Sequence, residues 1–170
     1  WRMSVMEIID SPSLYKDQRF FLNDESWDKL SKVNNDLALV VQHAIGMSDI
    51  EFQVLEGKRT TAEHEFLYSK GASQDAHFSS HFYGHAVDLV AYLNDKIILE
   101  KEPYDDLAQC MQYAAEYVGV PIVWGGAWHI PDLRGNVEFF EDLTNDFIIK
   151  QLKLDKTPII DFHHFEIPVE

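Results

Sequence analysis

The chain has 170 residues, the size of one compact domain, and its 46% hydrophobic and 13% aromatic content is that of a folded globular protein. A formal net charge of −15 disfavours nucleic acid as a partner, because phosphate binding needs clustered lysine and arginine, and no apolar run is long enough for membrane insertion. The single cysteine, Cys110, excludes an internal disulfide and a cysteine-based zinc site.

The spacing of apolar residues predicts the first elements of the fold. A helix is expected over 26–44, with Ser26 as its N-cap and Gly46 as its stop. A strand over 52–55 follows, and then a short helix over 61–70 that Gly71 closes. The serine- and histidine-rich stretch 72–83 is predicted to be a loop, and it leads into a strand over 86–93 that pairs with 96–99 as a hairpin.

The second half of the chain continues this alternation. A helix over 104–118 is expected to end at Gly119, and a strand over 121–124 to be broken by two glycines, Gly125 and Gly126. Residues 136–152 are predicted to be mostly helical, and 159–167 to form a final strand. Early helices followed by mixed strands with short connections favour an α+β fold, with a small, mostly antiparallel sheet flanked by helices in a single domain over 1–170.

The first segment that carries chemistry contains His81 and Asp88, and histidine and carboxylate are the ligands zinc prefers when thiolates are absent. On a helix these two residues would lie roughly 10.5 Å apart along the axis. Zinc bonds are only about 2.0–2.2 Å long, so one helix could hardly present both. A loop that turns back into a strand could, with Gly84 supplying the backbone freedom. Asp88 lies in an apolar strand, where a carboxylate needs a partner such as a metal.

The second segment contains Asp161, His163 and His164. If His164 binds a metal, Asp161 can lie next to the reacting water without being a ligand, which is the place of a general base. Strand alternation puts His163 and His164 on opposite faces, so only one of them should reach the metal. Three protein ligands and one open position form the usual catalytic zinc arrangement. Taken alone, each histidine would more readily be a structural residue.

Four motifs in order resemble the D-alanyl-D-alanine carboxypeptidase family of zinc peptidases, which includes phage endolysins of the L-alanyl-D-glutamate peptidase type. The first has the pattern Ser-x-His-x-x-Gly-x-Ala-x-Asp. The other three are a Gly-x-Arg-Thr motif upstream, a Trp-Gly-Gly-x-Trp run and an Asp-x-x-His-Phe-Glu motif. Here they are Ser79, His81, Gly84, Ala86 and Asp88; Gly57, Arg59 and Thr60; Trp124 to Trp128; and Asp161, His164, Phe165 and Glu166. The resemblance extends from about residue 54 to residue 167, and His64 and His163 depart from it.

This resemblance implies the zinc peptidase fold of the D-Ala-D-Ala carboxypeptidase and hedgehog type. It implies Zn²⁺ held by three ligands, a general base, an arginine that polarises the scissile carbonyl and stabilises the oxyanion, and a supporting polar contact. The three zinc ligands are His81, Asp88 and His164, and the general base is Asp161. The arginine is Arg59, and the supporting polar contact is Ser79. The glutamate after the ligand histidine, Glu166, is expected to be an exposed acid or one behind a ligand.

The function that the resemblance implies is hydrolysis of the L-Ala–D-Glu bond in peptidoglycan stem peptides by a zinc-activated water. One alternative is a D-Ala-D-Ala carboxypeptidase or dipeptidase on the same scaffold, and another is a zinc-stabilised binding module without catalysis. We expect a monomer that is made in the cytoplasm without a visible signal peptide and acts on the cell wall or in the periplasm. The roles of His64, His77 and His129 stay open.

Overall fold

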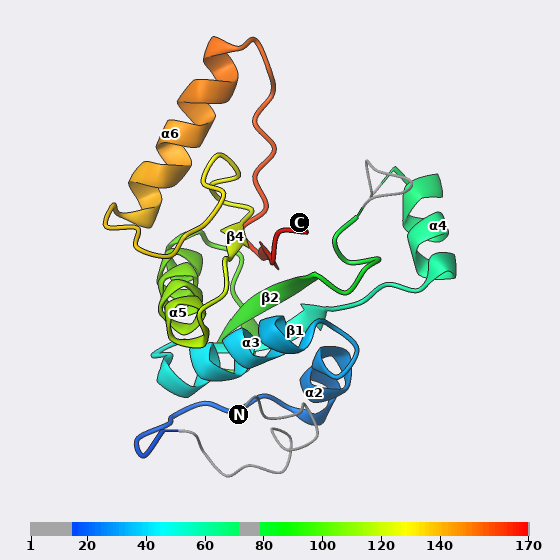
Figure 1. The fold of residues 1–170 in the computed structure, drawn as a ribbon, viewed down its shortest axis with the longest axis vertical. Helices are drawn as coiled ribbons and strands as arrows, with labels where there is room; N and C mark the ends of the chain where they lie inside the picture. The colour runs from blue at the N-terminus through cyan, green and yellow to red at the C-terminus, as the bar shows by residue number, and fades with distance from the viewer. Residues whose placement is uncertain (1–14, 72–78, 170) are drawn as a thin grey trace.

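The computed structural model describes residues 15–71 and 79–169, and Figure 1 shows its arrangement. The predicted loop over 72–83 thus lies partly outside the described residues, as do His77 and the side chain of His64. The elements in chain order are α2 (Asp24–Leu30), α3 (Asn35–Met47), β1 (Glu51–Glu56), α4 (Thr61–Ser69), β2 (Ala86–Leu93), β3 (Lys96–Ile97), α5 (Glu102–Val118), β4 (Val123–Trp124), α6 (Phe140–Lys153) and β5 (His164–Glu166).

The strands form one antiparallel sheet in the order β1-β2-β5-β4, with β3 paired to the outer part of β2. The strand β5 comes after the other described strands in the sequence, yet it lies between β2 and β4. Helices pack around this small sheet, so the predicted α+β class with a mostly antiparallel sheet is confirmed.

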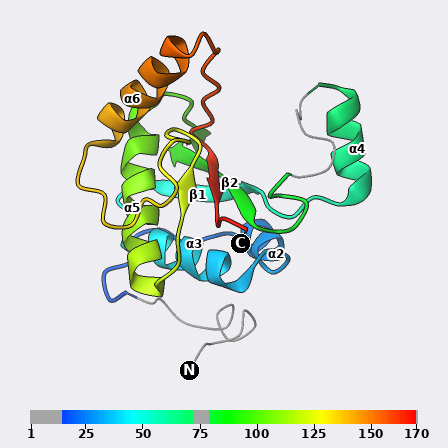
Figure 2. The same ribbon diagram turned by 45° about the horizontal axis from the view of Figure 1, so that its top comes forward.

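The core lies between the sheet and the helices α3 and α5, which pack against each other. Figures 1 and 2 both place these two helices side by side, and α2 packs against β1. The largest side chains that are fully buried come mostly from these two helices and the strands, with Leu30 from α2 and Ile122 from just before β4. They are Trp124, Tyr104, Phe52, Phe165, Leu30, Leu37, Ile45, Leu89, Leu107, Met111 and Ile122. Burial of this apolar surface stabilises the fold by about 25 cal/mol per Å², and it fixes the position of β2 and β5.

The single helix expected over 26–44 is wrong, because the chain forms two helices, α2 and α3, with a break after Leu30. Asn34 ends the break by accepting hydrogen bonds from the backbone N–H groups of Asp36 (2.8 Å) and Leu37 (3.3 Å), which caps α3. The predicted cap Ser26 is buried inside α2, and its hydroxyl instead bonds Gln53 and the backbone of Val54 on β1. The α2 cap is Asn23.

Other boundaries also differ from the prediction. Gly46 does not stop α3, which continues to Met47; a side chain at Gly46 would collide with the ring of Tyr15, so that glycine is needed for packing. The strand expected over 159–167 is only His164–Glu166, and the helix expected over 136–152 begins at Phe140. Gly71 and Gly119 follow their helices at positive φ, as predicted.

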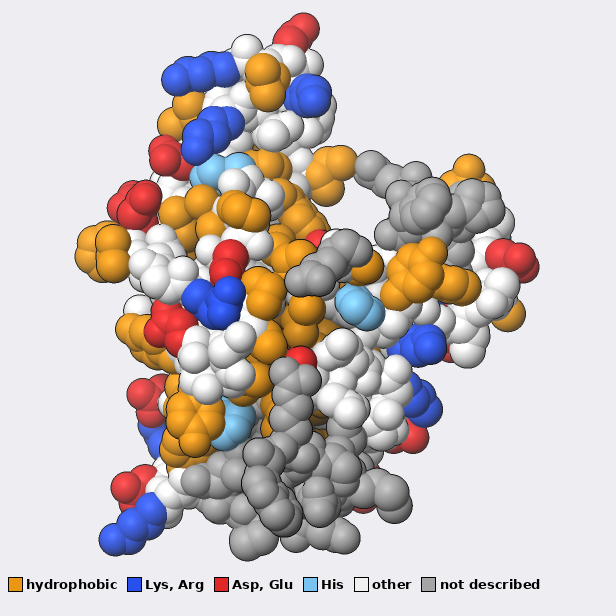
Figure 3. Space-filling model, viewed as in Figure 1, with side chains coloured by type: hydrophobic (Ala, Val, Ile, Leu, Met, Phe, Trp, Pro, Cys, Tyr) orange, Lys and Arg blue, Asp and Glu red, His pale blue; other side chains and the backbone are white. Residues whose placement is uncertain are grey.

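Two helices extend away from the sheet on opposite sides of the view in Figure 1, α4 on one side and α6 on the other. The last turn of α6 carries Lys150 and Lys153 and its first turn carries acids, which suits the helix dipole. Figure 3 shows basic side chains gathered at this far end of α6. Within the described part of the chain, no helix combines the length and the apolarity that crossing a membrane requires.

Candidate metal centre

His81 lies in a tight turn that precedes β2. The turn closes with hydrogen bonds from the backbone N–H of Phe82 to the carbonyl of Ser79 (2.9 Å) and from Gly84 to the carbonyl of His81 (3.1 Å). Gly84 has φ +73°, which a residue with a side chain rarely adopts, so the prediction that this glycine allows the turn is confirmed. The imidazole of His81 is only 3% exposed.

A hydrogen bond fixes which nitrogen of His81 is available. Nδ1 lies 2.8 Å from the carbonyl oxygen of Gly57, so it donates its hydrogen there, and Nε2 is the nitrogen that faces Asp88 and His164. The neighbouring backbone is tied to the same turn, because the N–H of Arg59 donates to the carbonyl of His81 (3.1 Å). A side chain at Gly57 would press on the carbonyl of Lys29 at 3.1 Å. The segment 57–59 is thereby held between α2 and the turn.

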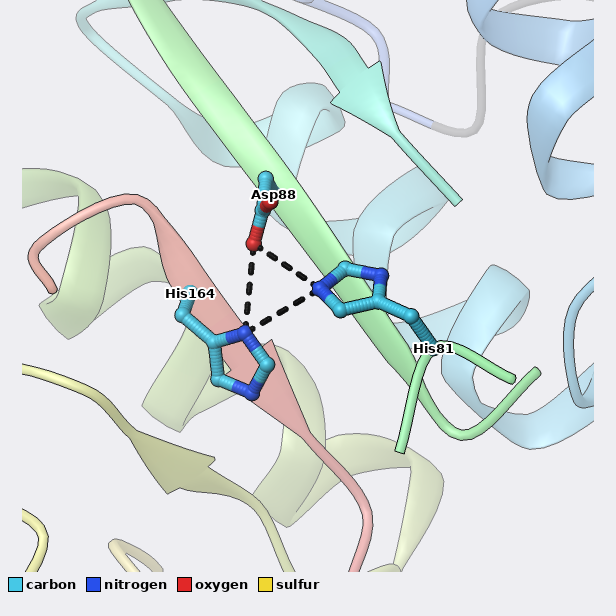
Figure 4. A group of neighbouring side chains, drawn as sticks. All are labelled: His81, Asp88 and His164. Atoms are coloured by element: carbon cyan, nitrogen blue, oxygen red, sulfur yellow. Dashed lines mark hydrogen bonds and ion pairs between the residues drawn. The ribbon is translucent and has the colours of Figure 1, made fainter. Parts of the chain in front are cut away.

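Asp88 and His164 are neighbours on two adjacent strands of the sheet. They are directly paired residues of the antiparallel strands β2 and β5, so their side chains lie on the same face. This pairing joins residues that are far apart in the sequence, and the turn before β2 adds His81 from the side. Figure 4 shows the three side chains pointing toward one another from these three segments.

The three potential ligand atoms form a nearly equilateral triangle. His81 Nε2 lies 3.1 Å from Asp88 Oδ1 and 3.2 Å from His164 Nδ1, and His164 Nδ1 lies 3.2 Å from Asp88 Oδ1. Two atoms bound to one zinc ion at about 2.0–2.2 Å each can be at most about 4.4 Å apart, so all three can share an ion. Two imidazoles and a carboxylate are also a donor set that zinc accepts.

The charges of the group reinforce this arrangement. Burial alone would raise the pKa of Asp88, but hydrogen bonds with His164 and His81 outweigh it and hold that pKa well below its usual range. Burial lowers the pKa of His164, yet the hydrogen bonds with Asp88 and Glu166 raise it to about 9. The metal-free site therefore keeps a proton on His164, which a bound cation would replace.

Glu166 holds the far side of the His164 ring. Its Oε2 accepts a hydrogen bond from His164 Nε2 at 3.0 Å, which leaves Nδ1 for the metal. Burial would raise the pKa of Glu166, but its hydrogen bonds with His164 and with the side chain of Ser80 lower it. The serine that reaches this network is thus Ser80, whereas Ser79, the residue expected from the sequence, contributes its backbone carbonyl to the turn.

The two neighbouring histidines have different surroundings. His163 packs its ring on Tyr104, with centroids 4.6 Å apart, while His164 enters the triangle. His163 precedes the first residue of β5, so the strand alternation expected for the two histidines does not apply to it. His129, whose role the sequence left open, stacks its ring on Phe147 of α6 at 5.8 Å.

Arg59 and Asp161 flank the triangle with opposite charges. The Nε and Nη2 atoms of Arg59 both bond the carboxylate of Glu56, the Nη2 contact being 2.6 Å. The hydrogen bonds that Arg59 donates to Glu56 are the main cause that raises the pKa of Arg59, and the charges of Asp88 and Asp161 add to it. Asp161 has a side chain that is 46% exposed, and its Oδ1 accepts a hydrogen bond from the N–H of His163.

The Trp-Gly-Gly-x-Trp run forms the wall next to β5. The N–H of Gly125 donates to the carbonyl of His164 (2.9 Å), and the N–H of Asp161 donates to the carbonyl of Gly125 (3.0 Å). Trp128 lies against the His164 ring with centroids 5.1 Å apart, and Trp124 is fully buried. This run therefore holds the backbone of the segment that carries both Asp161 and His164.

The chain is similar to a known family of proteins in its sequence and in its fold. Residues 18–142 match a family model described as phage L-alanyl-D-glutamate peptidase. The chain is 26% identical over 113 residues to the L-alanyl-D-glutamate peptidase of Escherichia phage T5, a match that covers 65% of this chain and 82% of the relative. Its fold is similar to the crystal structure of the Serratia marcescens L-Ala D-Glu endopeptidase ChiX, with a TM-score of 0.66, 26% identity, and coverage of 89% of this chain and 92% of the other.

Proposed function

Because this chain belongs to the phage L-alanyl-D-glutamate peptidase family, we propose that it hydrolyses the L-Ala–D-Glu bond of peptidoglycan stem peptides in a zinc-dependent reaction. The observation that carries the proposal is the triangle of His81 Nε2, Asp88 Oδ1 and His164 Nδ1 on one face of the sheet, over the inner strands β2 and β5. Each imidazole also has its other nitrogen engaged, by the carbonyl of Gly57 or by Glu166, as expected of oriented metal ligands.

In this proposal each residue has a distinct role. His81, Asp88 and His164 hold the ion, which when bound supplies the Lewis acidity that makes water nucleophilic near neutral pH. Asp161 takes a proton from the attacking water and passes it to the amine that leaves. The partial exposure of the Asp161 side chain suits this exchange, because substrate and water must reach it.

Arg59 completes the proposed site by stabilising the negative charge that develops on the scissile carbonyl oxygen. Its guanidinium is held rather than free, and it lies within the electrostatic reach of Asp88 and Asp161. Removal of one such donor commonly costs about 10²–10³ in kcat. We expect the enzyme to act as a monomer on the cell wall.

Digestion of purified peptidoglycan tests the proposal. Mass spectrometry of the products should show new amino-terminal D-Glu, and activity should disappear with a chelator and return with Zn²⁺. Release of D-Ala instead would make the protein a carboxypeptidase or dipeptidase. Absence of any cleavage by the zinc-loaded protein would leave only a zinc-stabilised binding module and would overturn the proposal.

A further inference from the structure

A β-bulge in β1 lies directly beside the metal centre. Val54 pairs with Leu89 and Glu56 pairs with Asp88, so one residue of β1, Leu55, has no partner on β2. Leu55 is 52% exposed, so its side chain is not part of the core. The bulge is therefore a feature of the backbone register rather than a packing position for a side chain.

The bulge decides which face of the sheet Glu56 occupies. Leu89 and Asp88 are consecutive, so their side chains point to opposite faces. Val54 lies opposite Leu89 on the core face, where both are almost fully buried. Without the extra residue, Glu56 would share that core face with Val54, where an unpaired carboxylate is costly. With it, Glu56 lies opposite Asp88 on the face that carries the metal centre.

On that face, the Glu56 carboxylate accepts hydrogen bonds from one edge of the Arg59 guanidinium. Both Nε and Nη2 donate to its two carboxylate oxygens, a paired geometry that fixes the plane of the group. The two side chains are 14% and 30% exposed, so solvent screens the pair only partly. The edge that carries Nη1 is not used by this carboxylate.

Two further carboxylates compete for the same guanidinium. Asp88 and Asp161 both act on Arg59 through their charges, and in the proposed function Asp88 holds the metal while Asp161 transfers the proton. A guanidinium that moved onto Asp88 would take a ligand from the ion, and one that moved onto Asp161 would pair with the base. The two hydrogen bonds from Arg59 to Glu56 oppose both movements, because either one would break them.

We infer that Glu56, turned toward the metal centre by the bulge at Leu55, is a positioning residue that holds Arg59 in place for the carbonyl oxygen of the substrate. This inference rests on the proposed function. It assigns Glu56 no contact with the substrate or the ion, since its effect passes entirely through Arg59. The bulge thus contributes to the site by setting the face of the sheet on which Glu56 meets Arg59.

A double-mutant cycle measures whether Glu56 acts through Arg59. Glu56→Gln keeps the shape and removes the charge, and we expect kcat to fall about 10- to 100-fold with KM within about twofold, since a small misplacement of a catalytic group has effects of this size. In the background of Arg59→Met, the same change should alter kcat less than about twofold. Equal losses in both backgrounds, or no loss in the first, would overturn the inference.

A second measurement does not depend on catalysis. In the wild type, the Nε–H resonance of Arg59 should be visible by NMR because its hydrogen bond to Glu56 slows exchange with water, and it should vanish in Glu56→Gln. Persistence of the resonance would overturn the inference. Glu51→Gln removes the same charge at the other end of β1 and is the matched control, which should leave both readouts unchanged. If the wild type cleaves nothing, the proposed function fails while the NMR result still judges the contact.

Discussion

Replacement of Gly125 by alanine is a sharp test of how the backbone of the site is held. A Cβ at Gly125 would lie 2.2 Å from the carbonyl oxygen of Asp161 and 3.0 Å from Cζ2 of Trp128, whereas ordinary contacts begin at 3.4 Å. Neither obstacle is the flexible end of a side chain, because one is backbone and the other an aromatic ring. The segment that carries Asp161 must therefore move by about 1 Å, since the methyl group cannot.

The displacement acts on both stability and activity. Overpacking of this kind costs about 1–3 kcal/mol in the free energy of unfolding. A misplacement of about 1 Å can lower the rate about 100-fold, and Asp161 is the proposed base. Zinc affinity should fall less than the rate, because only one of the three ligands, His164, lies on the displaced segment, while His81 and Asp88 lie on other segments.

Three measurements check this prediction: the rate of stem-peptide cleavage, the midpoint of urea unfolding, and a calorimetric titration with Zn²⁺. Gly135→Ala is the control, because a Cβ there would meet no atom within 4 Å, and its backbone has a positive φ of +72°. It should cost about 1 kcal/mol of stability through backbone strain and leave the rate unchanged. A Gly125→Ala protein that cleaves within twofold of the wild type would refute the reasoning.

Three further outcomes follow from the site. Asp161→Asn should lower kcat about 10²–10⁴-fold while zinc affinity stays the same, and a loss of zinc instead would make Asp161 a ligand. Glu166→Gln should weaken zinc binding about 10- to 100-fold, because the amide cannot orient His164 as the carboxylate does; calorimetry would show this, and unchanged affinity would contradict it. The raised pKa of His164, about 9, has two consequences. The metal-free protein should lose up to about 3 kcal/mol of stability as the pH rises through 9, because the folded state binds the proton more tightly than the unfolded state, with its ordinary pKa near 6.5. Zinc affinity should rise about tenfold per pH unit between 7 and 9, because binding displaces that proton; a pH-independent affinity would rule this out.

The sequence predicted much of the metal triangle because its signals are local. The spacing of His81 and Asp88 required a turn into a strand, and Gly84 marked that turn. The register of the Asp-x-x-His-Phe-Glu motif, rather than strand alternation, selected His164, and His163 in fact precedes β5. What no local pattern could supply was the pairing of Asp88 with His164, which depends on β2 and β5 being neighbours.

The errors of prediction have physical causes. Apolar spacing continues from Leu30 through Val33 to Leu37, all buried, so periodicity does not register the break between α2 and α3. Only the cap Asn34 signalled it. The stretch before His164 has the composition of a strand, but the N–H of Asp161 bonds Gly125 rather than a sheet ladder. Glu56 was missed because a β-bulge depends on the register of two strands and leaves no mark in one of them.

The central place of β5 in the sheet has a consequence for how the protein matures. Along the chain β5 follows the other described strands, so during synthesis β2 and β4 must wait with open edges until it inserts between them. Before that step Asp88 and His81 alone offer a cation two weak donors. All three ligand atoms can therefore meet only after β5 has paired with β2.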